Sequence, residues 1–93
     1  MTDVRAHIEE GLRYQKLGML DRALREYERT LEASNDPVLR CEGLCRQAHV
    51  FRAWWQWDRA GEIARRGVDL ARTSGLPQQE AEALNAEAIV YVE

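Results

Sequence analysis

Long hydrophobic runs are missing from this sequence. No stretch approaches the roughly 18 apolar residues that a membrane-spanning helix needs, and residues 1–6 lack the apolar core of a signal peptide. Cysteine is scarce as well, because two cysteines in 93 residues do not make a disulfide scaffold. We therefore expect a cytoplasmic protein with no membrane partner.

Catalytic motifs are missing too. The chain has no Gly-x-Ser-x-Gly, no glycine-rich phosphate loop and no His-Glu-x-x-His. Carboxylates are plentiful, but those at Glu9, Glu10, Glu26, Glu28 and Glu32 fit the solvated faces of amphipathic helices. We expect no enzymatic activity and no cofactor.

An excess of positive charge is also missing. The net charge is −3 and the pI is about 5.4, whereas a domain that neutralises phosphates is normally basic. The short basic cluster Arg65-Arg66 lies between Glu62 and Asp69, a mixture typical of a solvated helix face. We expect no nucleic-acid partner.

Proline is rare and strand patterns are lacking, which favours helices. Only Pro37 and Pro77 interrupt a chain dominated by alanine, glutamate, arginine and leucine, all good helix formers. No run of alternating β-branched residues argues for a strand. The sequence predicts an all-α fold in a single domain, residues 1–93.

Turn-forming residues divide this domain into five predicted helices. We expect them to begin near five residues: Asp3, Leu20, Pro37, Trp57 and Pro77. Gly18 in a left-handed conformation would end the first helix, and the turn residues 34–37 and 73–75 would end the second and fourth. The connections are short, so consecutive helices should be antiparallel.

The chain also repeats itself. Asp-Arg-Ala occurs at 21–23 and again at 58–60, 37 residues later. The same offset aligns Gly11 with Ala48 and Tyr14 with Phe51. Small residues let two helices approach closely, and the aromatic residues fill the space beside them. Such internal repetition predicts a stack of helix pairs.

These positions resemble the tetratricopeptide repeat (TPR). The resemblance is carried by small and aromatic residues in three units: Gly11-x-x-Tyr14, Gly18, Ala23-x-x-x-Tyr27 and Pro37; Ala48-x-x-Phe51 and Ala60-x-x-x-Ala64; Ala88-x-x-Tyr91. The period exceeds the ~34 residues of the family, as in arrays of bacterial regulatory proteins. The resemblance implies an antiparallel helix-pair solenoid with repeats at 1–36 and 37–75 and the first helix of an incomplete repeat at 76–93.

The second unit departs from the family pattern. Trp55 stands where a turn glycine is favoured, and Ala64 where a large aromatic is usual. We expect Trp55 and Trp57 to pack into the turn, with the bulk of one of them covering the space at Ala64. The alternative is that the tryptophans form a recognition patch. Trp54 lies off the apolar stripe and should be exposed, where it could contact another chain.

One helix face carries potential metal ligands. Cys41, Cys45 and His49 recur at steps of four residues, and thiolates with imidazole suit zinc. However, three ligands that span about 12 Å along one helix cannot surround an ion tetrahedrally. We expect no metal, and interpret these residues as two small apolar thiols and a surface histidine.

The resemblance implies that the first helices of the pairs line a concave groove for a peptide or helix of a partner protein. The groove residues would be Arg5, Ile8, Glu9, Leu12, Gln15, Lys16, Cys45, Arg46, His49, Arg52, Asn85 and Ile89. A Lys/Asn clamp for a terminal carboxylate is not expected, because only Arg46 among the matching positions could serve. Arg46 and Arg52 beside Ile8 and Leu12 would suit a segment with acidic and apolar residues.

The last helix supports an alternative function. It is apolar on more than one face, and the helix that should cover it does not follow in the sequence. Either the chain is part of a longer array, or a second copy covers this face and forms a homodimer. The residues expected at such an interface are Trp54, Ala88, Ile89, Tyr91 and Val92.

Overall fold

Five α-helices form the computed structural model, which describes residues 3–92, with side chains up to Ala88. The helices are α1 (Val4–Lys16), α2 (Leu20–Ala33), α3 (Pro37–Ala53), α4 (Trp57–Thr73) and α5 (Pro77–Val92). Within these residues there is no β-strand. The all-α prediction is confirmed, and each helix begins within one residue of its expected start.

Local signals account for the helix ends. The Asp3 side chain accepts a hydrogen bond from the Arg5 backbone N–H at 3.1 Å, and Asp36 caps α3 in the same way through Val38 at 3.0 Å. Gly18 follows α1 with a φ of 76°, the left-handed conformation expected there. Trp55 follows α3 with a φ of 63°, so a tryptophan ends this helix where a glycine would be usual.

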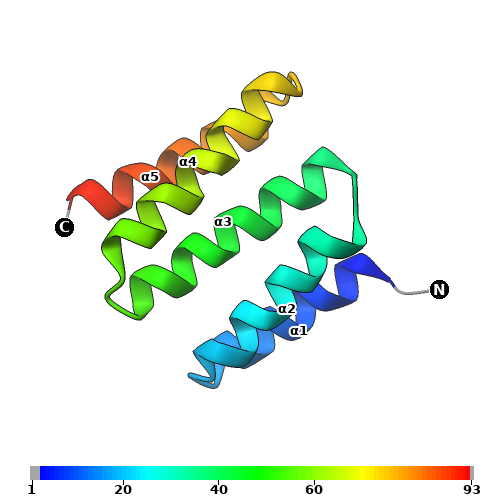
Figure 1. The fold of residues 1–93 in the computed structure, drawn as a ribbon, viewed down its shortest axis with the longest axis vertical. Helices are drawn as coiled ribbons and strands as arrows, with labels where there is room; N and C mark the ends of the chain where they lie inside the picture. Colours follow the sequence, from blue (N-terminus) through cyan, green and yellow to red (C-terminus); the bar gives the residue numbers. More distant parts are fainter. Residues whose placement is uncertain (1–2, 93) are drawn as a thin grey trace.

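Consecutive helices lie antiparallel, and α3 lies between α1 and α2 on one side and α4 and α5 on the other (Figure 1). The turns α1–α2 and α3–α4 lie at one end, and the turns α2–α3 and α4–α5 at the other. The central helix α3 contacts all four others. Within the described residues, α1 and α2 make no contact with α5, and neither contacts α4. Each of the other four helices therefore contacts α3 and one further helix.

The α1–α2 pair is packed around one aromatic ring. Tyr27 is fully buried together with Ala23 and Val50, and its hydroxyl donates to Oε1 of Gln15 at 2.9 Å. A Cβ on residue 11 would overlap the ring of Tyr27. Gly11 is therefore required for the close helix approach that the repeat predicts.

The α3–α4 pair is packed with smaller side chains. Ala48 and Ala64 are buried with Ala86 of α5, and Ile63 packs against them. Trp57 instead packs beside Phe51. The space at Ala64 is closed by alanines and Ile63, so the expectation that a tryptophan covers it is wrong.

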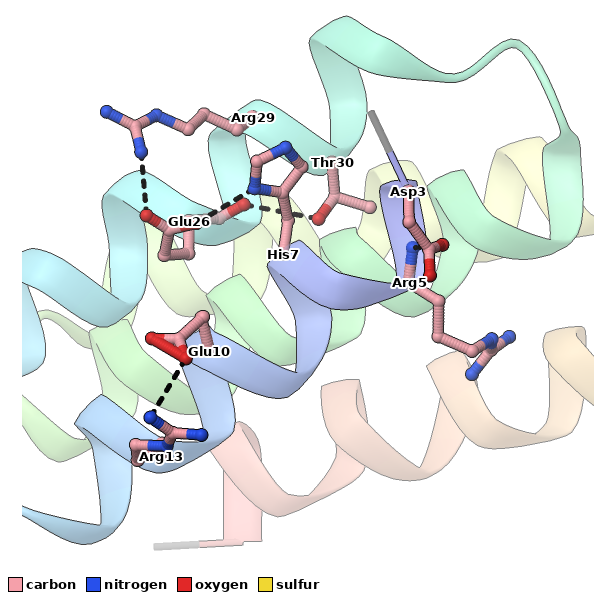
Figure 2. Close-up of polar contacts among 8 residues, drawn as sticks. All are labelled: Asp3, Arg5, His7, Glu10, Arg13, Glu26, Arg29 and Thr30. Atoms are coloured by element: carbon pink, nitrogen blue, oxygen red, sulfur yellow. Dashed lines mark hydrogen bonds and ion pairs between the residues drawn. The ribbon is translucent and has the colours of Figure 1, made fainter. Parts of the chain in front are cut away.

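A polar network joins α1 to α2 (Figure 2). Nδ1 of His7 donates to Oε1 of Glu26 at 2.9 Å, and Nη1 of Arg29 donates to Oε2 at 2.8 Å. The Thr30 hydroxyl donates to the backbone oxygen of Glu26 at 3.2 Å. Glu26 is only 9% exposed, so its assignment to a solvated helix face is wrong. Its two partners supply the hydrogen bonds that a buried carboxylate needs.

None of the helices in residues 3–92 is long and apolar enough to cross a bilayer.

Candidate partner-binding groove

A hollow of about 450 Å³ lies between α1, α3 and α5. These are every second helix of the chain, and α3 contacts both of the others. The hollow is lined by Arg5 of α1, by Val38, Glu42, Cys45, Arg46 and His49 of α3, and by Gln79, Glu82 and Asn85 of α5. Residues far apart in the sequence thus share one concave surface, which we call the groove.

The structure brings five of the predicted groove residues together. They are Arg5, Cys45, Arg46, His49 and Asn85. The others on α1 lie outside the hollow: Glu9 and Lys16 are exposed, and Leu12 and Gln15 are half-buried. The side chain of Ile89 lies outside the described residues.

Two predicted groove residues are placed differently from expectation. Ile8 is only 2% exposed, so it belongs to the core and cannot contact a partner. Its helical spacing marks an apolar face, and that face packs inward. Arg52 lines a separate hollow beside the α3–α4 turn. The groove is therefore more polar than the predicted mixture of arginines with Ile8 and Leu12.

Glu42 organises the charges of the groove and was not predicted. Its carboxylate lies 3.5 Å from Nη2 of Arg5 on α1 and 4.0 Å from Nη2 of Arg46 on its own helix. The i,i+4 spacing to Arg46 was a readable signal. The pairing with Arg5 was not, because it depends on how α1 lies against α3. Glu82 adds a second acid from α5.

Two titratable groups on the α3 side of the groove, His49 and Cys45, stay uncharged near neutral pH. Burial lowers the pKa of His49, and Arg52 and Arg46 lower it further. Burial raises the pKa of Cys45 to about 11, with a smaller contribution from Cys41. The groove thus offers a neutral imidazole and a protonated thiol, and a thiol of this kind is a poor nucleophile.

The remaining thiol of this helix face is structural. Cys41 is 1% exposed, and its Sγ donates to the backbone oxygen of Gly67 at 3.9 Å. It packs as a small apolar side chain, as predicted, whereas His49 is half-buried and not on the open surface. No group of three His, Cys, Asp or Glu side chains in the described part of the chain could hold a metal ion.

The three tryptophans lie around the α3–α4 turn. Trp54 is 38% exposed, as predicted, but Trp55 is 77% exposed, so the expectation that it packs into the turn is wrong. Its left-handed conformation ends α3 and leaves the indole outside the helix pair. Trp57 is half-buried, and its ring meets that of Trp55 edge to face, with centroids 5.6 Å apart and an interplanar angle of 86°.

The predicted self-association surface is described only in part. Ala88 is exposed, and Leu84, which is 39% exposed, precedes it by one helical turn on the same face as the exposed Ala81. The side chains of Ile89, Tyr91 and Val92 lie outside the described residues. An apolar stripe on α5 is therefore open to solvent over the part that the structure describes.

Comparisons with protein-family models, with curated proteins and with solved structures found no match to this chain.

Proposed function

We propose that this protein is a TPR-type helix-pair solenoid, in one domain, that binds a segment of a partner protein in the groove. The observation that carries the proposal is the hollow of about 450 Å³ lined by alternate helices α1, α3 and α5. In a stack of helix pairs, the first helices of successive pairs share one concave surface. The repeat of small residues at Gly11 and Ala48 supports the same arrangement.

The lining of the groove indicates the chemistry of the bound segment. Ligand hollows commonly measure about 300–1,000 Å³, so this one suits an extended stretch of a few residues. Arg46 and Glu82 offer one charge of each sign, and Gln79, Asn85 and the neutral His49 offer hydrogen bonds. A polar segment of mixed charge fits this surface best. The protein would act as a cytoplasmic adaptor with no catalysis of its own.

The test is a peptide-display screen followed by calorimetry on the selected peptides. Arg46→Ala and Asn85→Ala should each weaken binding by about tenfold or more, because both side chains line the groove. Arg66→Ala is the matched control, since Arg66 is exposed on α4 outside the groove. Peptides whose affinity is the same for Arg46→Ala, Asn85→Ala and the parent protein would contradict the proposal.

Self-association through α5 is the second candidate. The exposed stripe of Ala81, Leu84 and Ala88 favours it, because apolar side chains aligned on one helix face often mark an interface. A homodimer through this face should dissociate when Leu84 becomes Glu, which can be followed by sedimentation velocity over a range of concentrations. A monomer at all concentrations, for the parent protein and the variant alike, would exclude it.

A further inference from the structure

Trp55 has an unusual backbone conformation. The chain uses a left-handed residue after α1 and after α4, and both are glycines, Gly18 at 76° and Gly75 at 67°. After α3 the same role falls to Trp55, at 63°. A side chain with a Cβ is strained in this region, whereas glycine is not. A glycine would therefore make a more stable turn than the tryptophan that occupies it.

Burial does not compensate for this strain. Trp55 is 77% exposed, so its indole contributes little to the core. Its ring meets Trp57 edge to face, and Trp57 in turn packs against the core beside Phe51. Strained residues that do not stabilise the fold tend to be found at functional sites. The conformation therefore indicates a use for the exposed indole.

The two indoles form the wall of a small hollow. This hollow measures about 190 Å³ and is lined by Arg52, Ala53, Trp55 and Trp57. It is far smaller than the groove, and Arg52 is the only residue of its lining predicted for the groove. Its size admits one bulky side chain but not a helix. We call it the tryptophan pocket.

The charge beside the pocket is positive and lacks a partner. Nε of Arg52 is buried and has no hydrogen-bond acceptor in the described part of the chain, and no ion pair of Arg52 is found there. Between Phe51 and Gly61 two arginines, Arg52 and Arg59, accompany one acid, Asp58. Arg52 as a whole is half-buried, so a carboxylate in the pocket would pair with the positive charge of its guanidinium.

We infer that the tryptophan pocket is a second docking site, which takes an acidic segment of a partner protein. A bulky apolar side chain of that segment enters the pocket and packs against the indoles of Trp55 and Trp57. A neighbouring Asp or Glu carboxylate accepts hydrogen bonds from the guanidinium of Arg52. Aromatic and arginine side chains together are the residues that most often dominate binding energy. The site is separate from the groove and does not depend on the proposed function.

The experiment follows the indole N–H signals in a 1H–15N NMR spectrum, where the three tryptophans give three resonances. The probe is the blocked peptide acetyl-Asp-Glu-Phe-Asp-Glu-amide. It should shift the signals of Trp55 and Trp57 in a saturable way and leave Trp54 unaffected. Two matched peptides, Asp-Glu-Ala-Asp-Glu and Asn-Gln-Phe-Asn-Gln, remove the ring or the charges, and each should bind at least about tenfold more weakly.

Trp55→Gly separates a binding role from a structural one. We expect this variant to melt roughly 4–8 °C higher, because the strain is removed, and to lose peptide binding. Arg52→Gln should weaken the acidic peptide and leave Asn-Gln-Phe-Asn-Gln unchanged. Trp54→Ala is the control for a nearby exposed tryptophan outside the pocket, and Arg46→Ala is the control for the groove. Both should bind the probe as the parent protein does.

Three results would overturn the inference. The first is wild-type binding by Trp55→Gly. The second is an equal affinity for the acidic peptide and its amide counterpart. The third is a change of the Trp55 signal with protein concentration alone, which would assign the surface to a second copy of this chain. Loss of peptide binding in Arg46→Ala with no effect of Trp55→Gly would place the peptide in the groove instead.

Discussion

The two helix pairs α1–α2 and α3–α4 differ in where one aromatic side chain lies: in the interior at Tyr27 and in the turn at Trp55. In α1–α2, Tyr27 fills the interior against Gly11, and a glycine, Gly18, makes the turn. In α3–α4, the positions matching Tyr27 and Gly18 hold Ala64 and Trp55. At these two matched positions the aromatic side chain is therefore inside the first pair and on the surface of the second, while Phe51 is buried in α3–α4. The space between two equivalent helices can thus be filled by one large ring or by several small side chains. In the second pair the aromatic residue Trp55 lies at the surface instead.

The strongest test of this difference is Tyr27→Ala, which gives the first pair the alanine of the second. The lost ring leaves a cavity beside Gly11, and Oε1 of Gln15 loses the hydroxyl that donates to it. We expect the free energy of unfolding to fall by about 3–5 kcal/mol. Urea denaturation followed by circular dichroism measures it. A loss below about 1 kcal/mol would show that the first pair can repack as the second does.

Gly11→Ala should give the next largest effect. The added Cβ would overlap the buried ring of Tyr27, so we expect a loss of about 1–3 kcal/mol. Gly43→Ala is the control, because a Cβ there meets Leu31 and Thr30 at an ordinary 3.5 Å. That variant should gain up to about 1 kcal/mol from helix propensity. Equal effects at the two glycines would mean that the overlap is relieved without cost.

Substitutions at the left-handed residue of each turn should change the stability in opposite directions. Trp55→Gly should stabilise the protein by about 1 kcal/mol, because glycine adopts a positive φ without strain. Gly18→Ala should destabilise it by about 1 kcal/mol for the same reason, since space is open around residue 18. Both values come from the same urea titrations. A destabilised Trp55→Gly variant would instead assign the indole a structural role.

The smallest effect is a pH dependence from His49. The pKa of this residue is lowered in the folded protein by burial and by Arg52 and Arg46, so the unfolded chain binds more protons between the folded pKa and about 6.5. Stability should therefore decline as the pH falls below about 6.5. The measurement is the difference between the parent protein and His49→Gln at pH 7.5 and 5.5. Identical pH profiles for the two would contradict this assignment.

The helix ends could be predicted from short sequence signals. Asp3 and Pro37 mark starts, and Gly18 marks a stop, because their effect depends on backbone conformation and on neighbours within a turn. The small size of Gly11 also predicted a close approach correctly, although it did not show that Tyr27 is the ring involved. Five of the nine groove residues, among them Cys45, Arg46 and His49, were predictable from the resemblance to the repeat.

The errors concern side chains whose position depends on a second helix. The resemblance to the repeat places Ile8 in the groove, but the packing of α1 buries this side chain in the core. Glu26 was assigned to solvent because charged residues usually lie there, but His7 and Arg29 enclose it. Trp55 was assigned to the interior because large apolar residues are usually buried. The left-handed turn overrides that tendency.

Some features of this protein are therefore set by local sequence, and others by the packing of its helices. Its five helices, their limits and their small contact residues follow from the order of amino acids, because capping, turn chemistry and helix propensity act over a few residues. The burial of Glu26, the ion pairs of Glu42 and the exposure of Trp55 follow only from the packing of helices that are distant in the sequence. Contacts of that kind depend on the distance and angle between helices, which no local pattern of residues encodes.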